Sequence, residues 1–303
     1  MTTPPIFATG IAGHLRLGLG GAPLGNLFNA VSDPDARTLI DAAWDSGCRS
    51  FDTAPHYGHG LSERRMGDAL RVHSRRDYVL ASKVGRLLTP SDTAPREQHS
   101  FVDILPFNQH WDYSAAATRR SVEDSLQRLG LARLDVAFVH DLDRENHGER
   151  APAVLRQVLD ETLPTLQQLK REGLIGAVGL GVNDQQVVLD VLRHADLDAL
   201  LLAGRYTLLD HSALPELLPL CLLRGVHVAL GGVFNSGILA TGTQGVQPTF
   251  NYAPAAQNWL QRTARIEAHC QQHGVALRAA ALQFVLAHPA IEIVMLGARR
   301  AAE

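Results

Sequence analysis

The stretch SVEDSLQRLGLARLDVAFVHD, residues 121–141, has the pattern of a helix followed at once by a buried strand. Val122, Leu126 and Leu129 recur at the spacing of one helix face, and the glycine after them is a typical helix stop. The run 134–140 is then almost continuously apolar, as expected for a strand that is covered on both faces. Such a unit is typical of α/β folds with a parallel sheet.

The same unit recurs along the chain on both sides of this stretch. Helix-like segments separate eight short apolar runs, at 15–19, 50–52, 78–83, 134–140, 175–180, 199–203, 226–230 and 292–296. Eight strands that alternate with helices, with no linker or low-complexity tract, predict one α/β (β/α)8 TIM barrel, a single domain over residues 1–303. A doubly wound sheet is the competing fold, but the glycines of residues 18–25 lack the GxGxxG spacing of its phosphate loop.

The composition argues against several classes of protein. The 28 Lys and Arg residues nearly balance the 31 Asp and Glu residues, and no basic run is present, so nucleic acid is not expected as the main partner. The mean hydropathy of −0.03 and the lack of a long apolar run argue against a membrane span. No secretory signal is visible, and Cys48, Cys221 and Cys270 lack metal spacing, which predicts reduced, buried thiols in a cytoplasmic protein.

Two connections are unusually long. Residues 85–113 follow the third expected strand and residues 231–254 follow the seventh, so both lie at the end of the barrel where active sites are built. Loops of this length are often functional lids. Their aromatic residues are expected either to wall a pocket or to pack each loop onto the barrel: Phe101, Phe107, Trp111, Tyr113, Phe234, Phe250 and Tyr252.

Four ionisable residues lie at or just beyond the ends of consecutive strands: Asp52, Tyr57, Lys83 and His140. In a barrel these positions converge on one part of one rim. A neighbouring Lys83 ammonium is expected to lower the pKa of Tyr57, while Asp52 pairs with Lys83 and His140 binds the substrate oxygen. Such a set exchanges a proton with a carbonyl or hydroxyl group, and its natural complement is a hydride carrier.

A metal hydrolase is a weaker alternative at the same rim. His140, Asp141 and Asp143 are close together after the fourth strand, as in some metal sites. The first strand, however, ends without the HxH pair of such barrels, and Lys83 would need a different role. We therefore expect no metal site.

The tetrad lies within motifs that resemble the aldo-keto reductase family. DTAPHYGHGLSERRMGDAL, residues 52–70, is similar to the family pattern DTAxxYGxxxSExxxGxAL. ASKVG around Lys83, residues 121–141 and LGAR near the C-terminus occur in the family's order. The resemblance implies a TIM barrel that binds NAD or NADP without a Rossmann domain.

A narrower resemblance suggests the reaction. LGLGGAPLGNL near the start, LLAGRYTLLDHSALPELLPLC from Leu201, GGVFNSGIL from Gly231 and FNYAPA from Phe250 are similar to the bacterial D-threo-aldose dehydrogenase branch. Its members, which include L-fucose, galactose and pyridoxal dehydrogenases, oxidise a cyclic hemiacetal to a lactone. The resemblance implies that Tyr57 takes the hydroxyl proton, while the other tetrad residues tune and orient it.

The resemblance also implies a set of cofactor-binding residues: Gly21, Asp52, Asn183, Gly231, Gly232, Phe234 and Arg299. Asn183 would hold the carboxamide, although Val182 replaces the serine that many relatives place before it. Many relatives have, after the seventh strand, a tyrosine that stacks on the nicotinamide, and this chain has Gly231 and Gly232 in that place. The nearby Phe234 is a candidate to provide a ring or an apolar wall instead. Arg299 would favour the extra phosphate of NADP, but both NAD and NADP stay open.

Two other functions stay open beside an NAD(P)-dependent aldose 1-dehydrogenase. One is a general aldehyde or ketone reductase with the same tetrad, and the other is a non-catalytic, cofactor-binding regulatory subunit. The sugar or carbonyl substrate, the direction of the reaction and the oligomeric state are not predicted. Only residues 297–303 follow the eighth expected strand, whereas relatives continue through a closing helix, so we expect the helix after strand eight to be missing.

Overall fold

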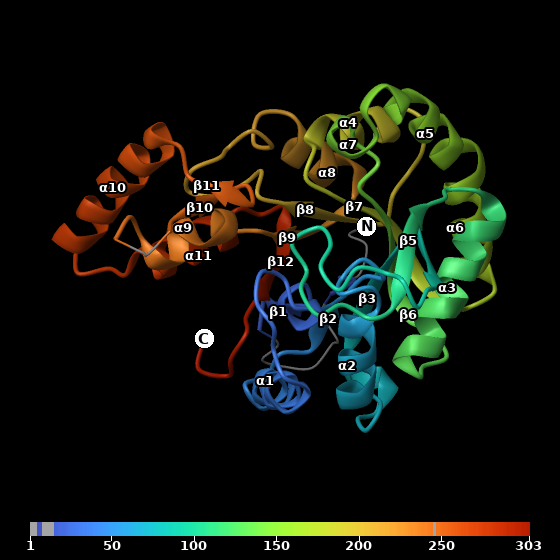
Figure 1. The fold of residues 1–303 in the computed structure, drawn as a ribbon. Helices are drawn as coiled ribbons and strands as arrows, with labels where there is room; N and C mark the ends of the chain where they lie inside the picture. The colour runs from blue at the N-terminus through green and yellow to red at the C-terminus, as the bar shows by residue number, and fades with distance from the viewer. Residues whose placement is uncertain (1–4, 8–14, 245–246) are drawn as a thin grey trace.

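The computed structural model describes residues 5–7, 15–244 and 247–303 (Figure 1). In these residues, eight parallel strands form a closed barrel in the order β1-β12-β9-β8-β7-β6-β3-β2. They are β1 (Leu17–Gly20), β2 (Ser50–Asp52), β3 (Val79–Val84), β6 (Leu134–His140), β7 (Ile175–Val182), β8 (Ala199–Ala203), β9 (His227–Gly231) and β12 (Ile291–Gly297). The predicted (β/α)8 barrel is confirmed, and each strand overlaps one of the eight predicted runs.

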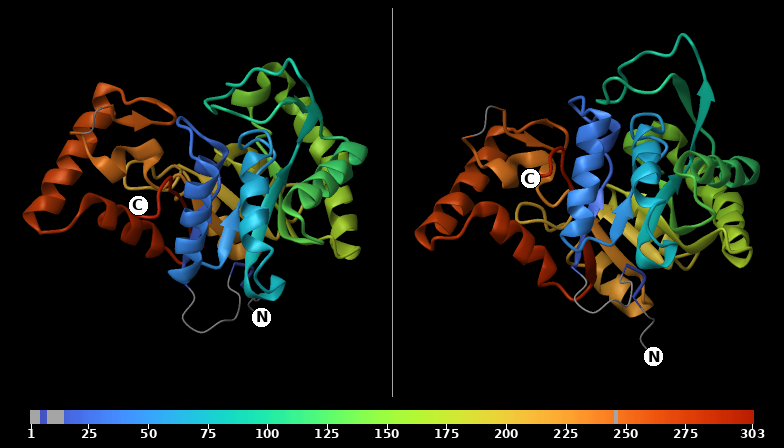
Figure 2. Two further views of the ribbon diagram at one scale, coloured as in Figure 1. Left: turned by 60° about the horizontal axis from the view of Figure 1, so that its bottom comes forward. Right: turned by 90° about the horizontal axis from the view of Figure 1, so that it is seen from below.

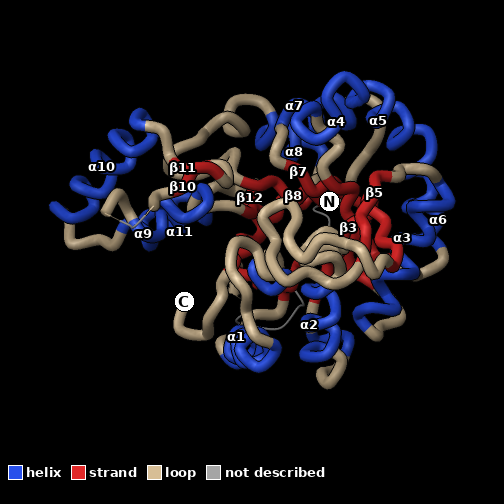
Figure 3. The backbone as a smooth tube through the Cα atoms, in the orientation of Figure 1, coloured by secondary structure: helices blue, strands red, loops and turns tan. Residues whose placement is uncertain are grey.

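Helices occupy the connections between consecutive barrel strands (Figure 3). Ser32 and Ser114 cap the first turns of α1 and α3 through their hydroxyl groups, and Gly130 ends α3 in a left-handed conformation. The helices are α1 (Asp33–Asp45), α2 (Leu61–Leu70), α3 (Ala115–Leu129), α4 (Arg144–His147), α5 (Ala151–Gln157), α6 (Leu163–Arg171), α7 (Gln185–Leu192), α8 (Leu217–Arg224), α9 (Ile238–Thr241), α10 (Gln257–Gln272) and α11 (Leu277–Leu286), with a π turn at Val158–Thr162 and 3₁₀ turns at Pro23–Gly25, Arg75–Asp77, Gly148–Arg150 and Asn235–Gly237.

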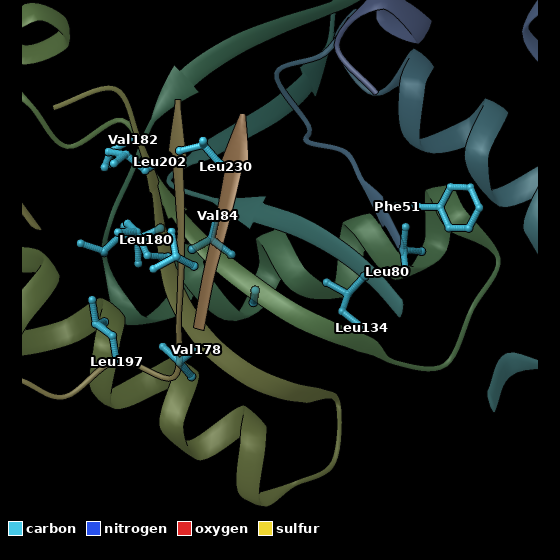
Figure 4. Close-up of a cluster of buried hydrophobic side chains, with 14 of the residues drawn as sticks. Phe51, Leu80, Val84, Leu134, Val178, Leu180, Val182, Leu197, Leu202 and Leu230 are labelled. Atoms are coloured by element: carbon cyan, nitrogen blue, oxygen red, sulfur yellow. The ribbon is translucent and has the colours of Figure 1, made fainter. Parts of the chain in front are cut away.

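Two apolar layers cover the two faces of the barrel sheet. One layer lies between the strands and the surrounding helices, and Figure 4 shows part of it around Leu80, Leu134 and Val178. The other layer includes Ala81 and Phe138, on the barrel's inner face. Alternate residues of each strand therefore point to different apolar layers, which explains the nearly continuous apolar runs in the sequence.

The first long connection contains an antiparallel hairpin that the sequence analysis did not predict. Its strands are β4 (Arg86–Pro90) and β5 (Phe107–Trp111), paired from Arg86 with Trp111 to Pro90 with Phe107. Phe101 and Tyr113 are buried, so these two aromatic residues pack the connection onto the barrel. The connection is thus an ordered part of the rim.

The second long connection contains the short strands β10 (Thr249–Phe250) and β11 (Ala253–Pro254). Phe250 is buried and stacks on Trp259, with 4.0 Å between the ring centroids, whereas Tyr252 is 54% exposed. Helix α10 follows and lies at the outer edge of the molecule, at the end of the fold away from α3 and α6 (Figures 1 and 2). Beyond β12, residues 298–303 form a turn.

Candidate active site

The register of the barrel brings three of the four tetrad residues to one rim. Along β3, Val79 and Ala81 belong to the inner layer, and Lys83 continues this alternation at the end of the strand. Along β6, Phe138 belongs to the same layer and His140 continues it. Because β3 and β6 are neighbours, and β2 pairs with β3 up to Asp52, these side chains meet at the ends of their strands.

Asp52 and Lys83 form a buried ion pair. The Lys83 ammonium donates hydrogen bonds to both carboxylate oxygens of Asp52 at 2.7 Å and to the carbonyl oxygen of Thr53 at 2.8 Å. The exposed fractions of the two side chains are 2% for Lys83 and 5% for Asp52. An ammonium group has three protons, so these acceptors occupy all of them.

Tyr57 lies beside this pair but receives no ammonium proton from it. The Lys83 Nζ atom is 4.8 Å from the centre of the Tyr57 ring. Burial raises the pKa of Tyr57 well above its ordinary value, and the charge of Asp52 raises it further. The prediction that Lys83 lowers the pKa of Tyr57 is therefore wrong for this structure, because Asp52 neutralises the ammonium and the phenol is buried.

His140, the fourth member of the predicted tetrad, lies beside Tyr57. The rings of the two residues are nearly perpendicular, with 6.0 Å between their centroids. Burial lowers the pKa of His140 well below its ordinary value, and Arg86 and Lys83 lower it further. The imidazole is consequently neutral at neutral pH.

The hairpin adds residues that the sequence analysis missed. Arg86 contacts the His140 ring and pairs with Asp141, whose Oδ2 lies 2.8 Å from Nη2 of Arg86. Gln109 accepts a hydrogen bond of 2.7 Å from Nδ1 of His56, next to the tetrad. The sequence could have predicted this ion pair, because Arg86 and Asp141 have opposite charges and follow the ends of strands that are neighbours in a barrel.

The residues assigned to the cofactor lie at the same rim around β7 and β9. Asn183 directly follows β7, and its backbone carbonyl oxygen accepts a hydrogen bond of 2.6 Å from Nε of Arg205. Gly231 ends β9, where a Cβ atom would lie 3.6 Å from that of Ala203, an ordinary contact. The packing of the protein therefore does not require a glycine at position 231. Because Gly231 has no side chain, a flat ring has room to approach the rim there.

The other assigned residues have contacts of their own. Gly21 is buried and donates to the carbonyl oxygen of Asp52 at 2.7 Å, and a Cβ atom there would lie only 2.5 Å from the Ser62 hydroxyl oxygen. Gly232 has a φ of +62°. Phe234 is half-buried between two apolar clusters, and Arg299 is exposed beyond β12. Their roles toward a cofactor stay predictions.

Neither a metal centre nor a membrane-spanning helix is found among the described residues. In that part of the chain, no group of three or more His, Cys, Asp or Glu side chains is arranged to hold a metal ion. Asp143 instead caps α4, where its Oδ1 accepts from the backbone N–H of Asn146 at 3.1 Å. No helix among the described residues combines the length and apolar character of a membrane span.

Comparisons with known proteins identify the family. The model of the aldo/keto reductase family matches residues 16–303. A pyridoxal 4-dehydrogenase of Microbacterium luteolum is 42% identical over 93% of this chain and 85% of its own length, and a D-threo-aldose 1-dehydrogenase of a Pseudomonas species is 37% identical over 100% and 90%. The solved structure of a Gluconobacter oxydans glycerol dehydrogenase has a TM-score of 0.72 and 25% identity, over 97% of this chain and 85% of that one. The chain therefore belongs to the aldo/keto reductase family and is an oxidoreductase.

Proposed function

We propose that this enzyme oxidises a cyclic hemiacetal, an aldose or a pyridoxal-like substrate, to a lactone with NAD or NADP. The observation that carries the proposal is the meeting of Tyr57 and His140 beside the buried Asp52–Lys83 pair, at the rim where a barrel binds its substrate. The relatives named for pyridoxal and for D-threo-aldose support the substrate class. Both substrates have a cyclic hemiacetal form.

The reaction removes one hydride and one proton from the hemiacetal. Tyr57 accepts the proton of the hydroxyl group as the carbon–oxygen double bond of the lactone forms. The bound nicotinamide ring supplies the acceptor for the hydride that leaves the same carbon. His140 binds the reacting oxygen and orients it toward Tyr57, while the Asp52–Lys83 pair keeps the Tyr57 phenol in place.

The residues around the rim suit a dinucleotide cofactor. Asn183 offers a side-chain amide to the carboxamide, and the glycines at the end of β9 leave space beside it. Arg299, just beyond the last strand, would attract a 2′-phosphate by its charge. We therefore propose use of NADP, with NAD as the alternative.

A dehydrogenase assay tests the proposal. L-fucose, D-arabinose and pyridoxal are each supplied with NAD or NADP at mildly alkaline pH, and both the reduced cofactor and the lactone are measured. We expect stoichiometric lactone and reduced cofactor from at least one substrate, and loss of both in Tyr57→Phe. Turnover of simple aldehydes or ketones alone would favour a general reductase, and cofactor binding without any turnover would favour a regulatory subunit.

A further inference from the structure

We infer that Arg86 is a positioning residue that holds His140 in the tautomer with its proton on Nε2. In this form the imidazole donates a hydrogen bond to the substrate oxygen. The role of this bond in turnover rests on the proposed function, whereas the tautomer is a property of the free protein. The argument comes from the atoms on either side of the ring.

The first constraint acts at Nδ1 of His140. Nη1 of Arg86 lies 2.8 Å from this atom, and the exposed fraction of the Arg86 side chain is 5%. A guanidinium group is a donor that does not deprotonate in proteins, so Nδ1 must present its lone pair. Rotating the ring by half a turn would place a C–H group against the guanidinium, so this orientation of the imidazole is the one that forms the bond.

The second constraint acts at Nε2. Oδ2 of Asp141 lies 3.4 Å from Nε2 of His140. An ionised carboxylate only accepts hydrogen bonds, so its negative charge beside Nε2 favours an N–H group there over a lone pair. The two atoms are close but form no hydrogen bond, so this N–H stays available to a substrate oxygen. Both neighbours of the ring therefore favour the same tautomer.

The Arg86 side chain links the two constraints. Arg86 binds Nδ1 of His140 through Nη1, and through Nη2 it binds Oδ2 of Asp141 at 2.8 Å. Asp141 has a φ of +46°, in the left-handed region that Asp adopts more readily than most residues, and its carboxylate lies beside the imidazole. The planar guanidinium is thus shared between the ring and the carboxylate.

The hairpin holds Arg86 in this position. The guanidinium carbon lies 3.7 Å from the centre of the Trp111 ring, and Arg86 pairs with Trp111 across β4 and β5. The Tyr113 hydroxyl group donates to the carbonyl oxygen of His140 at 2.7 Å, which fixes the end of β6. The positions of donor and acceptor are therefore set before any substrate binds.

The surrounding charges keep this tautomer neutral. The groups that face His140 are Arg86 from β4, Lys83 from β3, His56 and Tyr57 from the connection after β2, Asp52 through its pair with Lys83, and Asp141 beside it. Burial lowers the pKa of His140, and Arg86, Lys83 and His56 lower it further. Protonation of Nδ1 would also place its N–H group against an N–H group of Arg86, and the hydrogen bond between them would be lost.

Nuclear magnetic resonance of ¹⁵N-labelled histidine tests the inference in the free enzyme. The His140 signals are assigned by their loss in His140→Gln. In the wild type we expect an unprotonated Nδ1 and a protonated Nε2, with no titration between about pH 5 and pH 8. In Arg86→Met we expect a mixture of tautomers and a His140 pKa that is higher than in the wild type, because the guanidinium charge is gone while Asp141 keeps its negative charge beside the ring.

Two further variants keep this test interpretable. Arg86→Lys retains one donor, so we expect the Nε2–H tautomer to be partly restored relative to Arg86→Met. Arg96→Gln, in the same connection with an exposed side chain, should leave the His140 signals unchanged. If Arg86→Met folds with the wild-type His140 signals, the inference is wrong. If Arg86→Met does not fold, a wild-type His140 that is protonated on Nδ1, or that titrates between about pH 5 and pH 8, overturns it.

Kinetics give an independent readout once a substrate is known. We expect Arg86→Met to lower kcat by less than the about 10²–10³-fold loss typical of removing a transition-state hydrogen-bond donor outright, with little change in cofactor affinity. We also expect kcat of Arg86→Met to fall at a higher pH than kcat of the wild type as the solution is acidified, because the loss of the Arg86 charge raises the pKa of His140. Failure of every hemiacetal as a substrate would reject the proposed function, while the resonance result would still decide the role of Arg86.

Discussion

All three ammonium protons of Lys83 go to acceptors other than Tyr57. The Asp52 carboxylate and the Thr53 carbonyl oxygen accept these protons. The Lys83 ammonium contacts Tyr57 over the face of its ring and not at its hydroxyl group. The neutral phenol is therefore the stable form in the free enzyme. In the direction of reduction, the neutral phenol can donate a proton to the substrate at neutral pH. In the direction of oxidation, the phenolate form is needed to accept a proton.

The pH dependence of the two directions follows from this state of Tyr57. Because its pKa lies well above the ordinary value, we expect kcat/KM for oxidation to rise with pH through the alkaline range. Reduction, which uses the protonated form, should change little around neutral pH. Tyr57→Phe should lower kcat by about 10²–10⁴-fold and remove the alkaline rise.

A second buried tyrosine provides the matched control for Tyr57→Phe. Tyr78 precedes β3 at the opposite end of the barrel, and its hydroxyl group has no hydrogen-bond partner among the described residues. Tyr78→Phe should therefore preserve both pH profiles. An oxidation rate in the wild type that is flat from neutral to alkaline pH would contradict the role of Tyr57 as the base.

At the scale of elements, helices of similar length differ in how firmly they are attached. Helix α3 has 15 residues and buries seven of them, whereas α10 has 16 residues and buries Thr263 and Cys270. Figure 2 shows α10 at the outer edge of the fold. Most of the stability of a helix in a protein comes from its packed face, so α10 should open locally more easily.

Hydrogen exchange measured by mass spectrometry compares these helices. We expect amides of Gln257–Gln272 to exchange at least about tenfold faster than those of Ala115–Leu129, which corresponds to a local opening free energy lower by about 1.4 kcal/mol. The central strands β6 and β7 serve as the slow reference within the same sample. Equal protection of the two helices would show that contacts other than buried side chains stabilise α10.

The hairpin is the element that the sequence analysis did not find. Its strands are separated by residues 91–106, a connection far longer than the turns that make a hairpin recognisable in a sequence. Along β5, half-buried and exposed residues alternate, without an apolar face that marks a strand. The position of Arg86 depends on this pairing, which explains why its contact with His140 was missed.

At the scale of the molecule, the first and last strands must meet for the barrel to close. Gly18 in β1 pairs with Met295 of β12, and β1 also pairs with β2. A Cβ atom on Gly18 would lie 2.4 Å from the Met295 sulfur atom and 2.8 Å from the Ser50 carbonyl oxygen. The closure therefore depends on the small size of this residue.

Two substitutions in the same strand test the closure. We expect Gly18→Ala to lower the free energy of unfolding by about 1–3 kcal/mol, since the new atom collides with both neighbouring strands. Gly20→Ala should stay within about 1 kcal/mol of the wild type, because its nearest contact would be 3.5 Å away. Urea unfolding monitored by circular dichroism gives both values, and equal losses would contradict this account.

The single domain predicted for residues 1–303 stays a prediction. It is supported by a hydrophobic core that extends from Leu19 in the first strand to Val294 in the last. Such a core is expected when all eight strands share one sheet and the helices cover its outer face.

The sequence by itself determined the eight barrel strands and predicted the four residues that meet at their rim. Strand and helix periodicities are local, and parallel strands place their ends on one rim, so the positions of Asp52, Lys83 and His140 followed from the fold class. The tertiary structure alone decided that Asp52 and Thr53 take the protons of Lys83 and that Arg86 binds His140. These contacts join residues far apart in the chain, and they depend on side-chain distances and burial, which local patterns of residue type do not specify.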